Sequence, residues 1–221
     1  MISSRDNVRL KLVRKLHERR WREKLGLFFV EGEDAVEAAT AEPVDLLQAG
    51  KDVEAKLLAE VATAGHPPRM IGVYRREDLP RWEQRDATLA LWRLADPGNV
   101  GTLIRTADAF GAAVALSEGC ADPTSPKALR ASAGSIWRVP IGSWDEPGGM
   151  RVALEAHCGE PLAELGLQPP VVFLLGAERA GLPAEVERDV EARIAIESAE
   201  SLNVAATGAI ALYELRRSSA F

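Results

Sequence analysis

This chain of 221 residues has little of what secreted, membrane-spanning or metal-binding proteins need. Its two cysteines, Cys120 and Cys158, are too few for a disulfide framework. Eighteen apolar residues never run together, and the N-terminus is basic and amphipathic, so neither a membrane span nor a signal peptide is expected. His157 precedes Cys158, but no second spaced pair of metal ligands exists. We therefore expect a cytoplasmic protein without a metal and without a membrane partner.

Charge is unevenly distributed along the chain, whose formal net charge is −6. Residues 1–85 contain 16 Lys and Arg against 15 Asp and Glu, whereas residues 86–221 contain 11 against 18. Residues 5–24 alone contain nine basic and three acidic side chains. A positive stripe on an acidic body suits contact with RNA phosphates, although a solvated helix face would give the same pattern.

Composition and alternating patterns predict an α/β protein. Hydrophobic residues make up 47% of the chain and charged residues 27%, as in folded globular proteins. Short strand and helix patterns alternate in two regions of the chain, and a polar stretch over residues 75–86 separates these regions. We expect a small α/β domain over residues 1–80 and, over residues 86–221, a parallel sheet with helices on both faces.

The expected elements of the first domain end at clear breakers such as Gly26. Val8, Leu12 and Leu16 recur at helical spacing after a cap at Ser3 or Ser4. The expected order is a helix to Gly26, strand Leu27–Val30, helix Asp34–Ala41, strand Val44–Leu47, helix Asp52–Ala64 and strand Met70–Tyr74.

The sequence patterns that indicate strands and helices are stronger in the second domain than in the first. The expected strands are Thr88–Leu94, Ala112–Leu116, Ile136–Pro140, Val171–Leu175 and Ile194–Ile196. The expected helices are Val100–Phe110, Met150–Cys158, one beginning at Pro183 and carrying the acidic residues 185–191 on a solvated face, and Leu202–Arg217. Ligands of parallel sheets gather at the carboxyl ends of the strands, so the loops there are the candidate site.

Familiar phosphate and hydrolase motifs are absent. No G-x-G-x-x-G follows a strand, and no G-x-S-x-G is present. Gly176 and Gly181 have P-loop spacing, but Leu182-Pro183 replaces the required Lys-Ser/Thr.

The first candidate loop leads from Asp96 into a helix. Arg105 lies one turn beyond Gly101, and helical side chains lean toward the N-terminus, so Arg105 is expected to extend over Gly101 toward Asn99. An amide, a guanidinium and a helix N-terminus then converge on a spot suited to a phosphate or ribose. The alternative is that Asn99 only caps the helix and Arg105 lies on the surface.

The second and third candidate loops carry polar residues that packing alone does not explain. Glu178 follows a buried strand, either bracing its loop or presenting a carboxylate to a pocket. Ser201 and Asn203 are both good cap residues for the last helix, so one of them is free for another role.

Together these loops resemble the motifs of the SpoU/TrmH family of RNA ribose 2′-O-methyltransferases. The matching strings are Asp96-Pro-Gly-Asn-Val-Gly-Thr-Leu-Ile-Arg105, Ser125-Pro-Lys-Ala-Leu-Arg-Ala-Ser-Ala-Gly134, Leu175-Gly-Ala-Glu-Arg-Ala-Gly-Leu182 and Glu200-Ser-Leu-Asn-Val204. The string from Ser4 through Asn7 to Phe29-Val-Glu-Gly32 resembles the substrate-binding domain of the rRNA-modifying branch.

The resemblance implies a C-terminal trefoil knot, bound S-adenosylmethionine (SAM) and a homodimer with its active sites near the interface. The implied SAM contacts are Gly176, Ile194 or Ile196, Leu202 and Asn203. The implied catalytic and ribose-positioning residues are Arg105, Asn99, Glu178, Ser201 and Asn203. Because a guanidinium is effectively always protonated, Arg105 is expected to hold RNA phosphate and ribose, with general-base action a second hypothesis.

The segment that leads to the third motif departs from the family pattern in two ways. Family members usually carry a proline after the strand that leads to the third motif, whereas Ile194-Ala195-Ile196-Glu197 has none. The stretch between Ile196 and Ser201 is also shorter than in the family by one to three residues. SAM affinity is the property that these departures affect.

The resemblance and the basic stripe together predict methyl transfer to a ribose of 23S-type rRNA. Trp21 is available there for base stacking. The expected RNA-binding residues are Arg9, Lys11, Arg14, Lys15, Arg19, Arg20, Lys127 and Arg130. The alternatives are a tRNA ribose methyltransferase and a non-catalytic RNA-binding member of the fold.

Overall fold

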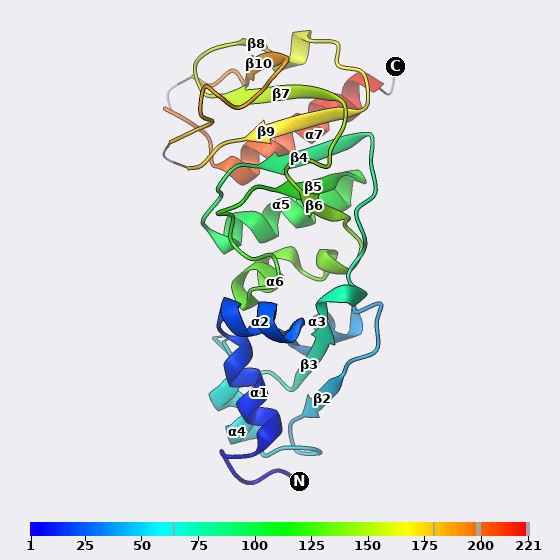
Figure 1. Ribbon diagram of the computed structural model, residues 1–221, viewed down its shortest axis with the longest axis vertical. Helices are drawn as coiled ribbons and strands as arrows, with labels where there is room; N and C mark the ends of the chain where they lie inside the picture. The colour runs from blue at the N-terminus through cyan, green and yellow to red at the C-terminus, as the bar shows by residue number, and fades with distance from the viewer. Residues whose placement is uncertain (64, 179, 198–199, 220–221) are drawn as a thin grey trace.

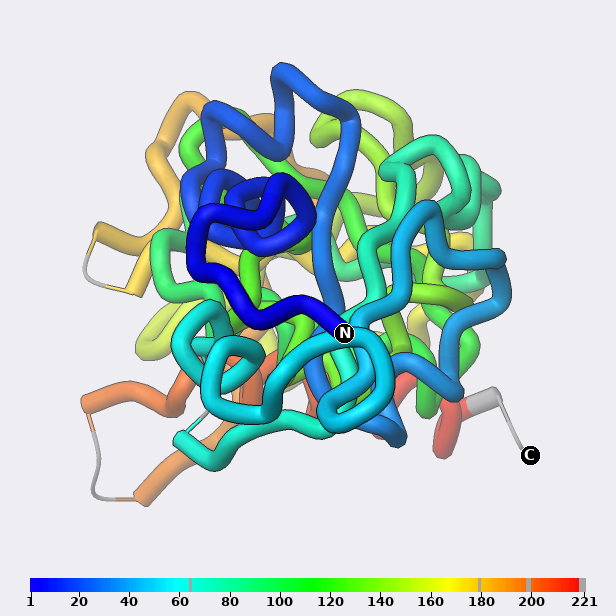
Figure 2. Tube along the Cα trace, turned by 90° about the horizontal axis from the view of Figure 1, so that it is seen from below, coloured from blue at the N-terminus to red at the C-terminus, as the bar shows by residue number. Residues whose placement is uncertain are grey.

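The computed structural model describes residues 1–63, 65–178, 180–197 and 200–219 and contains two sheets stacked along the long axis of the molecule (Figure 1). The N-terminal elements occupy one end of that axis, which Figure 2 views from below. The helices are α1 Val8–Leu16, α2 Arg19–Leu25, α3 Glu33–Glu37, α4 Ala55–Val61, α5 Pro97–Phe110, α6 Pro126–Ser132 and α7 Val204–Ser219, with short 3-10 turns η1 Arg76–Asp78, η2 Ser135–Trp137 and η3 Leu162–Glu164.

The smaller sheet is antiparallel, in the order β1-β3-β2. Its strands are β1 Leu27–Glu31, β2 Asp45–Gln48 and β3 Met70–Arg75. Helices α1 and α4 cover it with a core that includes Leu10, Leu58 and Ile71. All the expected elements of this region are present, although α4 is shorter than expected and Ala64 lies outside the described residues.

Three details of the first helix were predicted wrongly. Asn7, not Ser3 or Ser4, caps α1, with its side chain accepting from the N–H of Arg9. The buried stripe is Leu10, Val13 and Leu16, whereas Val8 is 77% exposed. The expected single helix also divides at residues 17–18 into α1 and α2, and Gly26 ends α2 in the left-handed conformation.

The larger sheet has seven parallel strands in the order β6-β5-β4-β9-β7-β10-β8. Its strands are β4 Ala87–Leu91, β5 Ala113–Leu116, β6 Ile141–Ser143, β7 Met150–Glu155, β8 Glu160–Pro161, β9 Val171–Leu175 and β10 Val190–Arg193. Every residue of β9 is buried, as the apolar run after two prolines predicts.

In the described part of the chain, helices cover one face of this sheet, not both as expected. Alternate strand residues such as Leu89 and Phe173 pack with α5 and α7, and α6 packs on α5. The opposite face, which includes Ala90 and Leu174, packs against Trp92, Trp144, Leu182 and Val186 from loops, and no helix of the described chain contributes to that cluster.

The two segments that were expected to form helices on the second face form a strand and a loop instead. Residues 150–155 form β7 between β9 and β10 despite a composition that favours helix, and Val152 and Ala153 are buried on its two faces. No helix begins at Pro183, so the acidic run over residues 185–191 is not a helix face. Residues 135–137 form a 3-10 turn before β6, and the last strand, β10, ends at Arg193 rather than spanning Ile194–Ile196.

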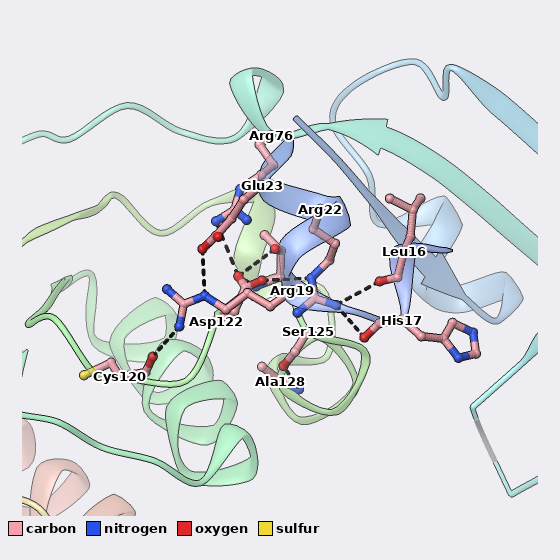
Figure 3. A network of polar contacts seen from close by, with 11 residues as sticks. Leu16, His17, Arg19, Arg22, Glu23, Arg76, Cys120, Asp122, Ser125 and Ala128 are labelled. Atoms are coloured by element: carbon pink, nitrogen blue, oxygen red, sulfur yellow. Dashed lines mark hydrogen bonds and ion pairs between the residues drawn. The ribbon is translucent and has the colours of Figure 1, made fainter. Parts of the chain in front are cut away.

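A buried ion pair joins the first part of the chain to the larger sheet (Figure 3). The guanidinium of Arg22 donates to Asp122 at 2.8 Å and to the carbonyl oxygens of Leu16 and His17, and both charged side chains are 3% exposed. Arg76 reaches the other oxygen of Asp122 at 3.4 Å, and Thr124 donates to the same oxygen. This network fixes α2 to the loop that follows β5.

Apolar contacts reinforce the junction. The rings of Phe28, Tyr74 and Trp137 lie within 6.0 Å of one another, so strands of the small sheet share a core with η2. The two sheets are therefore held in a fixed relation by burial as well as by charge.

The Asp122→Asn variant should lower the free energy of unfolding by about 3 kcal/mol, because it leaves the buried guanidinium of Arg22 without a counter-charge. Urea denaturation followed by circular dichroism measures this. The matched control is Asp6→Asn, whose exposed pair with Lys11 should contribute nothing measurable. Equal unfolding curves for the two variants would contradict a structural role of the junction pair.

The same pair predicts an acid-dependent loss of stability. Burial alone would raise the pKa of Asp122, but the charge of Arg76 and the hydrogen bonds from Thr124 and Arg22 outweigh burial and hold that pKa below its usual value. A depressed pKa gives stability that is complete above the unfolded-state pKa of about 4 and is lost as the pH falls through the folded-state pKa. The difference in unfolding free energy between wild type and Asp122→Asn should therefore be constant near neutral pH and shrink below about pH 4.

Candidate functional site

A cavity of about 620 Å³ opens where the loops after β7, β9 and β10 meet the start of α7. The candidate residues that line it are Gly176, Glu178, Ile194, Ile196, Ser201, Leu202 and Asn203. The second and third candidate loops therefore converge at the carboxyl edge of the sheet. The roles assigned to these residues stay predictions.

The first candidate loop joins this site through Asn99. Asp96 caps α5, with its side chain accepting from the N–H groups of Gly98 and Asn99, so the side chain of Asn99 is free for other contacts. Its Nδ2 donates to Glu178 at 3.2 Å, and its Oδ1 accepts from Asn203 at 3.3 Å. The alternative in which Asn99 is only a cap is wrong.

The three side chains form a hydrogen-bond chain with one direction. Asn203 Oδ1 accepts from the N–H of Ala205 at 2.8 Å at the start of α7, so its Nδ2 must point away from the helix. That Nδ2 donates to Asn99, which in turn donates to Glu178. The helix N-terminus thus orients two amides and leaves a carboxylate as the final acceptor. Asn203 is also the helix cap, which makes Ser201 the cavity residue without that task.

Gly176 permits the fold of the second loop. A Cβ at this position would collide with the backbone of Gly181 and Leu182. Ala177 and Gly181 exchange two backbone hydrogen bonds at 3.1 and 2.9 Å, which close the loop on itself. Any side chain at residue 176 would therefore displace one wall of the cavity.

Arg105 and Gly101 do not form the arrangement that the sequence suggested. A Cβ at Gly101 would collide with the carbonyl oxygen of Ala128, so this glycine allows α6 to approach α5 closely and does not clear space for an arginine. Arg105 is exposed, does not line the cavity, and has no hydrogen-bond or ion-pair partner among the described residues. Asp108, on the same face as Gly101, pairs with Arg138.

Sequence reasoning missed the contribution of β7 to the cavity. Leu154, Glu155 and His157 line it, as does Thr207 from α7. Burial raises the pKa of Glu155, although Arg188 at 3.2 Å opposes the shift. Had residues 150–155 been recognised as a strand, the carboxyl-end rule would have pointed to Glu155 and His157.

Several basic residues expected to bind RNA have partners within the protein. Arg9 pairs with Asp45, and Arg130 pairs with Glu31 at 2.5 Å, which ties α6 to β1. The remaining pairs are Lys11 with Asp6, Arg19 with Glu23, Arg20 with Glu18, and Lys127 with Asp96. Arg14 donates to the carbonyl oxygen of Arg5. Arg9 and Arg130 therefore link elements within the protein, and RNA contact by all of these residues stays a prediction.

Two negative findings apply to the part of the chain that the structure describes. No helix there has both the length and the apolar surface that crossing a bilayer demands. No group of three or more His, Cys, Asp or Glu side chains is placed to hold a metal ion in these same ranges.

Comparison with known proteins places the site in a family. Residues 86–213 match the model of the SpoU rRNA Methylase family. The chain belongs to this family. The resemblance drawn from the loop motifs is thereby confirmed, and the matched residues include every lining residue of the cavity.

Full-length relatives of this SpoU protein extend the likeness to the N-terminal part. The chain is 31% identical to a 23S rRNA (guanosine(2553)-2′-O)-methyltransferase, RlmP, of Bacillus subtilis, over 97% of this chain and 98% of that protein. It superposes with a TM-score of 0.86 on a crystal structure of an AdoMet-bound rRNA methyltransferase from Sinorhizobium meliloti, at 29% identity, over 98% and 97% of the chains. With the SpoU methyltransferase AviRb from Streptomyces viridochromogenes, in complex with AdoMet, the TM-score is 0.82 at 25% identity, over 97% and 98%.

Asn203 caps α7 and also donates a hydrogen bond to Asn99, and two substitutions can separate these roles. Asn203→Ala removes the cap of α7 and should lower the unfolding free energy by about 1 kcal/mol. Asn203→Ser keeps a cap acceptor and should restore most of that stability, while still lacking the amide that donates to Asn99. Thermal unfolding of both variants measures the difference, and equal losses would contradict capping by this side chain.

Proposed function

We propose that this protein transfers the methyl group of SAM to a ribose 2′-hydroxyl of ribosomal RNA of the 23S type. The observation that carries the proposal is the cavity at the strand ends, adjoined by the directed chain from Asn203 through Asn99 to Glu178. It is supported by family membership and by relatives of full length that are named as rRNA or 2′-O-methyltransferases.

The cavity fits SAM in size and chemistry. Its volume of about 620 Å³ lies within the ~300–1,000 Å³ of small-molecule sites. Apolar side chains such as Leu154 and Leu202 can hold an adenine ring, and the carboxylates of Glu155 and Glu178 suit a ligand that carries cationic groups. The residues proposed to contact SAM are Gly176, Ile194, Ile196, Leu202 and Asn203. When bound, SAM supplies an electrophilic methyl group, and no metal is needed.

The side chains beside the cavity suit a ribose. Methyl transfer to a hydroxyl depends chiefly on positioning, and a 2′-hydroxyl also needs an acceptor for its proton. Glu178, Ser201 and Asn203 line the cavity and Asn99 bonds to two of them, so carboxylate, hydroxyl and amide groups are available there. We propose that they orient the ribose, with Glu178 as the hydrogen-bond acceptor that Asn99 holds in place.

Arg105 is proposed to hold the RNA phosphate and ribose. Its guanidinium is permanently charged and has no described partner, so it is available to an anion. Because it lies outside the cavity of its own chain, we also propose a homodimer in which α5 of one protomer faces the cavity of its partner. Tyr213, which is 55% exposed on α7, the helix that packs on α5, is suited to such an interface.

The remaining parts of the proposal follow the family. We propose that residues 1–80 act as a substrate-binding domain and residues 86–221 as the methyltransferase domain with a C-terminal trefoil knot. The separate sheets on either side of residue 80 support the division. A ribosomal substrate would place the reaction in the cytoplasm.

The test is methylation of total RNA from a strain that lacks the gene. Purified protein and labelled SAM should give label in a ribose of 23S rRNA, mapped by nuclease digestion. Label in tRNA would favour a tRNA ribose methyltransferase instead. No label anywhere would favour a non-catalytic RNA-binding protein, which the shortened stretch between Ile196 and Ser201 makes worth testing. A calorimetric titration with SAM separates an absent cofactor site from a missing substrate.

Arg105→Ala should abolish turnover while SAM binding, measured by calorimetry, stays unchanged. Arg105→Lys keeps the charge but not the planar fork, so it should lose activity by at least about tenfold if the guanidinium binds phosphate through two parallel hydrogen bonds. Turnover of Arg105→Lys near that of wild type would contradict the requirement for a guanidinium.

A further inference from the structure

Three cations surround one half-buried indole ring at the elbow between α1 and α2. The ammonium of Lys15 lies 5.0 Å from the centroid of the Trp21 ring, that of Lys24 lies 5.2 Å away, and the guanidinium carbon of Arg20 lies 5.5 Å away. All three cationic side chains are exposed. We call these four residues the Trp21 cluster.

The Trp21 cluster has excess positive charge. Glu18 pairs with Arg20 at 2.7 Å, but no described carboxylate pairs with Lys15 or Lys24. Each exposed cation–π contact contributes only about 0.5–1 kcal/mol, and cations held around one ring repel one another. An anion that entered between the two ammonium groups would relieve this repulsion.

The cluster is fixed relative to the catalytic edge of the sheet. Arg19 donates to the carbonyl oxygen of Cys120 at 3.1 Å, and Arg22 pairs with the buried Asp122, so α2 is attached to the loop after β5 (Figure 3). The helical repeat of about 3.6 residues places Trp21 and Lys24 on the side of α2 away from Arg19. In Figures 1 and 2 the elbow lies toward the same side of the molecule as the loops after β9 and β10. A ligand held at Trp21 would thus be held at a constant distance from the cavity.

We propose that the Trp21 cluster binds one unpaired nucleobase of the substrate RNA, stacked on the indole, with the flanking phosphates on Lys15 and Lys24. The inference deepens the proposed function and rests on it for the identity of the substrate. Bases stack on aromatic rings only where they are unpaired, and a phosphate lies on each side of every internal nucleotide. The site requires no particular base, and its role is to anchor a single-stranded loop while a distant ribose enters the cavity.

A 12-nucleotide single-stranded RNA of mixed sequence and a 12-base-pair RNA duplex serve as probes, with binding followed by fluorescence anisotropy. Trp21→Ala should weaken binding of the single strand about tenfold, because stacking is lost, and Trp21→Phe should restore most of it. Binding of the duplex should change less than twofold in either variant. Circular dichroism confirms that both variants fold.

The lysines are tested by the salt dependence of the same binding. Lys15→Gln with Lys24→Gln should reduce the slope of log K against log salt by about 1.4 for the single strand, since two phosphate contacts are lost. The matched control is Lys51→Gln with Lys56→Gln, which removes the same charge from exposed sites elsewhere in the N-terminal region and should leave the slope unchanged.

Three results of the binding experiments would overturn the inference. These are unchanged single-strand binding in Trp21→Ala, equal losses for single strand and duplex, and Trp21-dependent binding to phosphatidylglycerol vesicles in place of RNA. In the methylation assay Trp21→Ala should raise KM for RNA about tenfold and leave kcat unchanged. If the wild type transfers no methyl group but Trp21→Ala still weakens single-strand binding, the proposed function is contradicted and the base-binding site is supported. If Trp21→Ala methylates RNA with an unaltered KM for RNA, only the proposed base-binding site is contradicted.

Discussion

The candidate site depends on the backbone N–H groups at the start of α7. These donors fix which end of the Asn203 amide faces the helix, and every later hydrogen bond in the chain follows from that choice. If Asn203 turned, its oxygen would meet the oxygen of Asn99, and Glu178 would lose the donor that orients it. A single helix end thus positions side chains from three segments, the first and last of which lie 104 residues apart in sequence.

The junction between the two sheets has a comparable role at larger scale. Asp122 follows β5 at the carboxyl edge, and its buried pair with Arg22 attaches α2 to the edge where the cavity opens. A buried ion pair is weak evidence for net stability, but it accepts only one geometry because either charge alone is costly to bury. The contribution of the pair is therefore the fixed placement of the basic N-terminal helices relative to the site.

The sequence predicted the elements with strong local signals and missed those that tertiary contacts decide. Val171–Leu175, α5 and the three converging loops could be found because an apolar run, a cap and the carboxyl-end rule each act locally. Met150–Glu155 has helix-forming residues, and only its insertion between β9 and β10 makes it a strand. The partners of Arg9 and Arg130 lie 36 and 99 residues away, so their structural role could not be read from a basic stripe.

The second face of the large sheet couples the site to the core. With no helix of the described chain over Ala90 and Leu174, the cover comes from Trp92, Trp144, Leu182 and Val186, which follow the carboxyl ends of strands. The segment after β9 thus contributes Gly176 and Glu178 to the cavity and, a few residues later, Leu182 and Val186 to the core. Displacing this segment would expose apolar surface of β9, at a cost that grows with the area uncovered. Loops at most sites are free to vary, but here the walls of the cavity are held by the hydrophobic core beneath them.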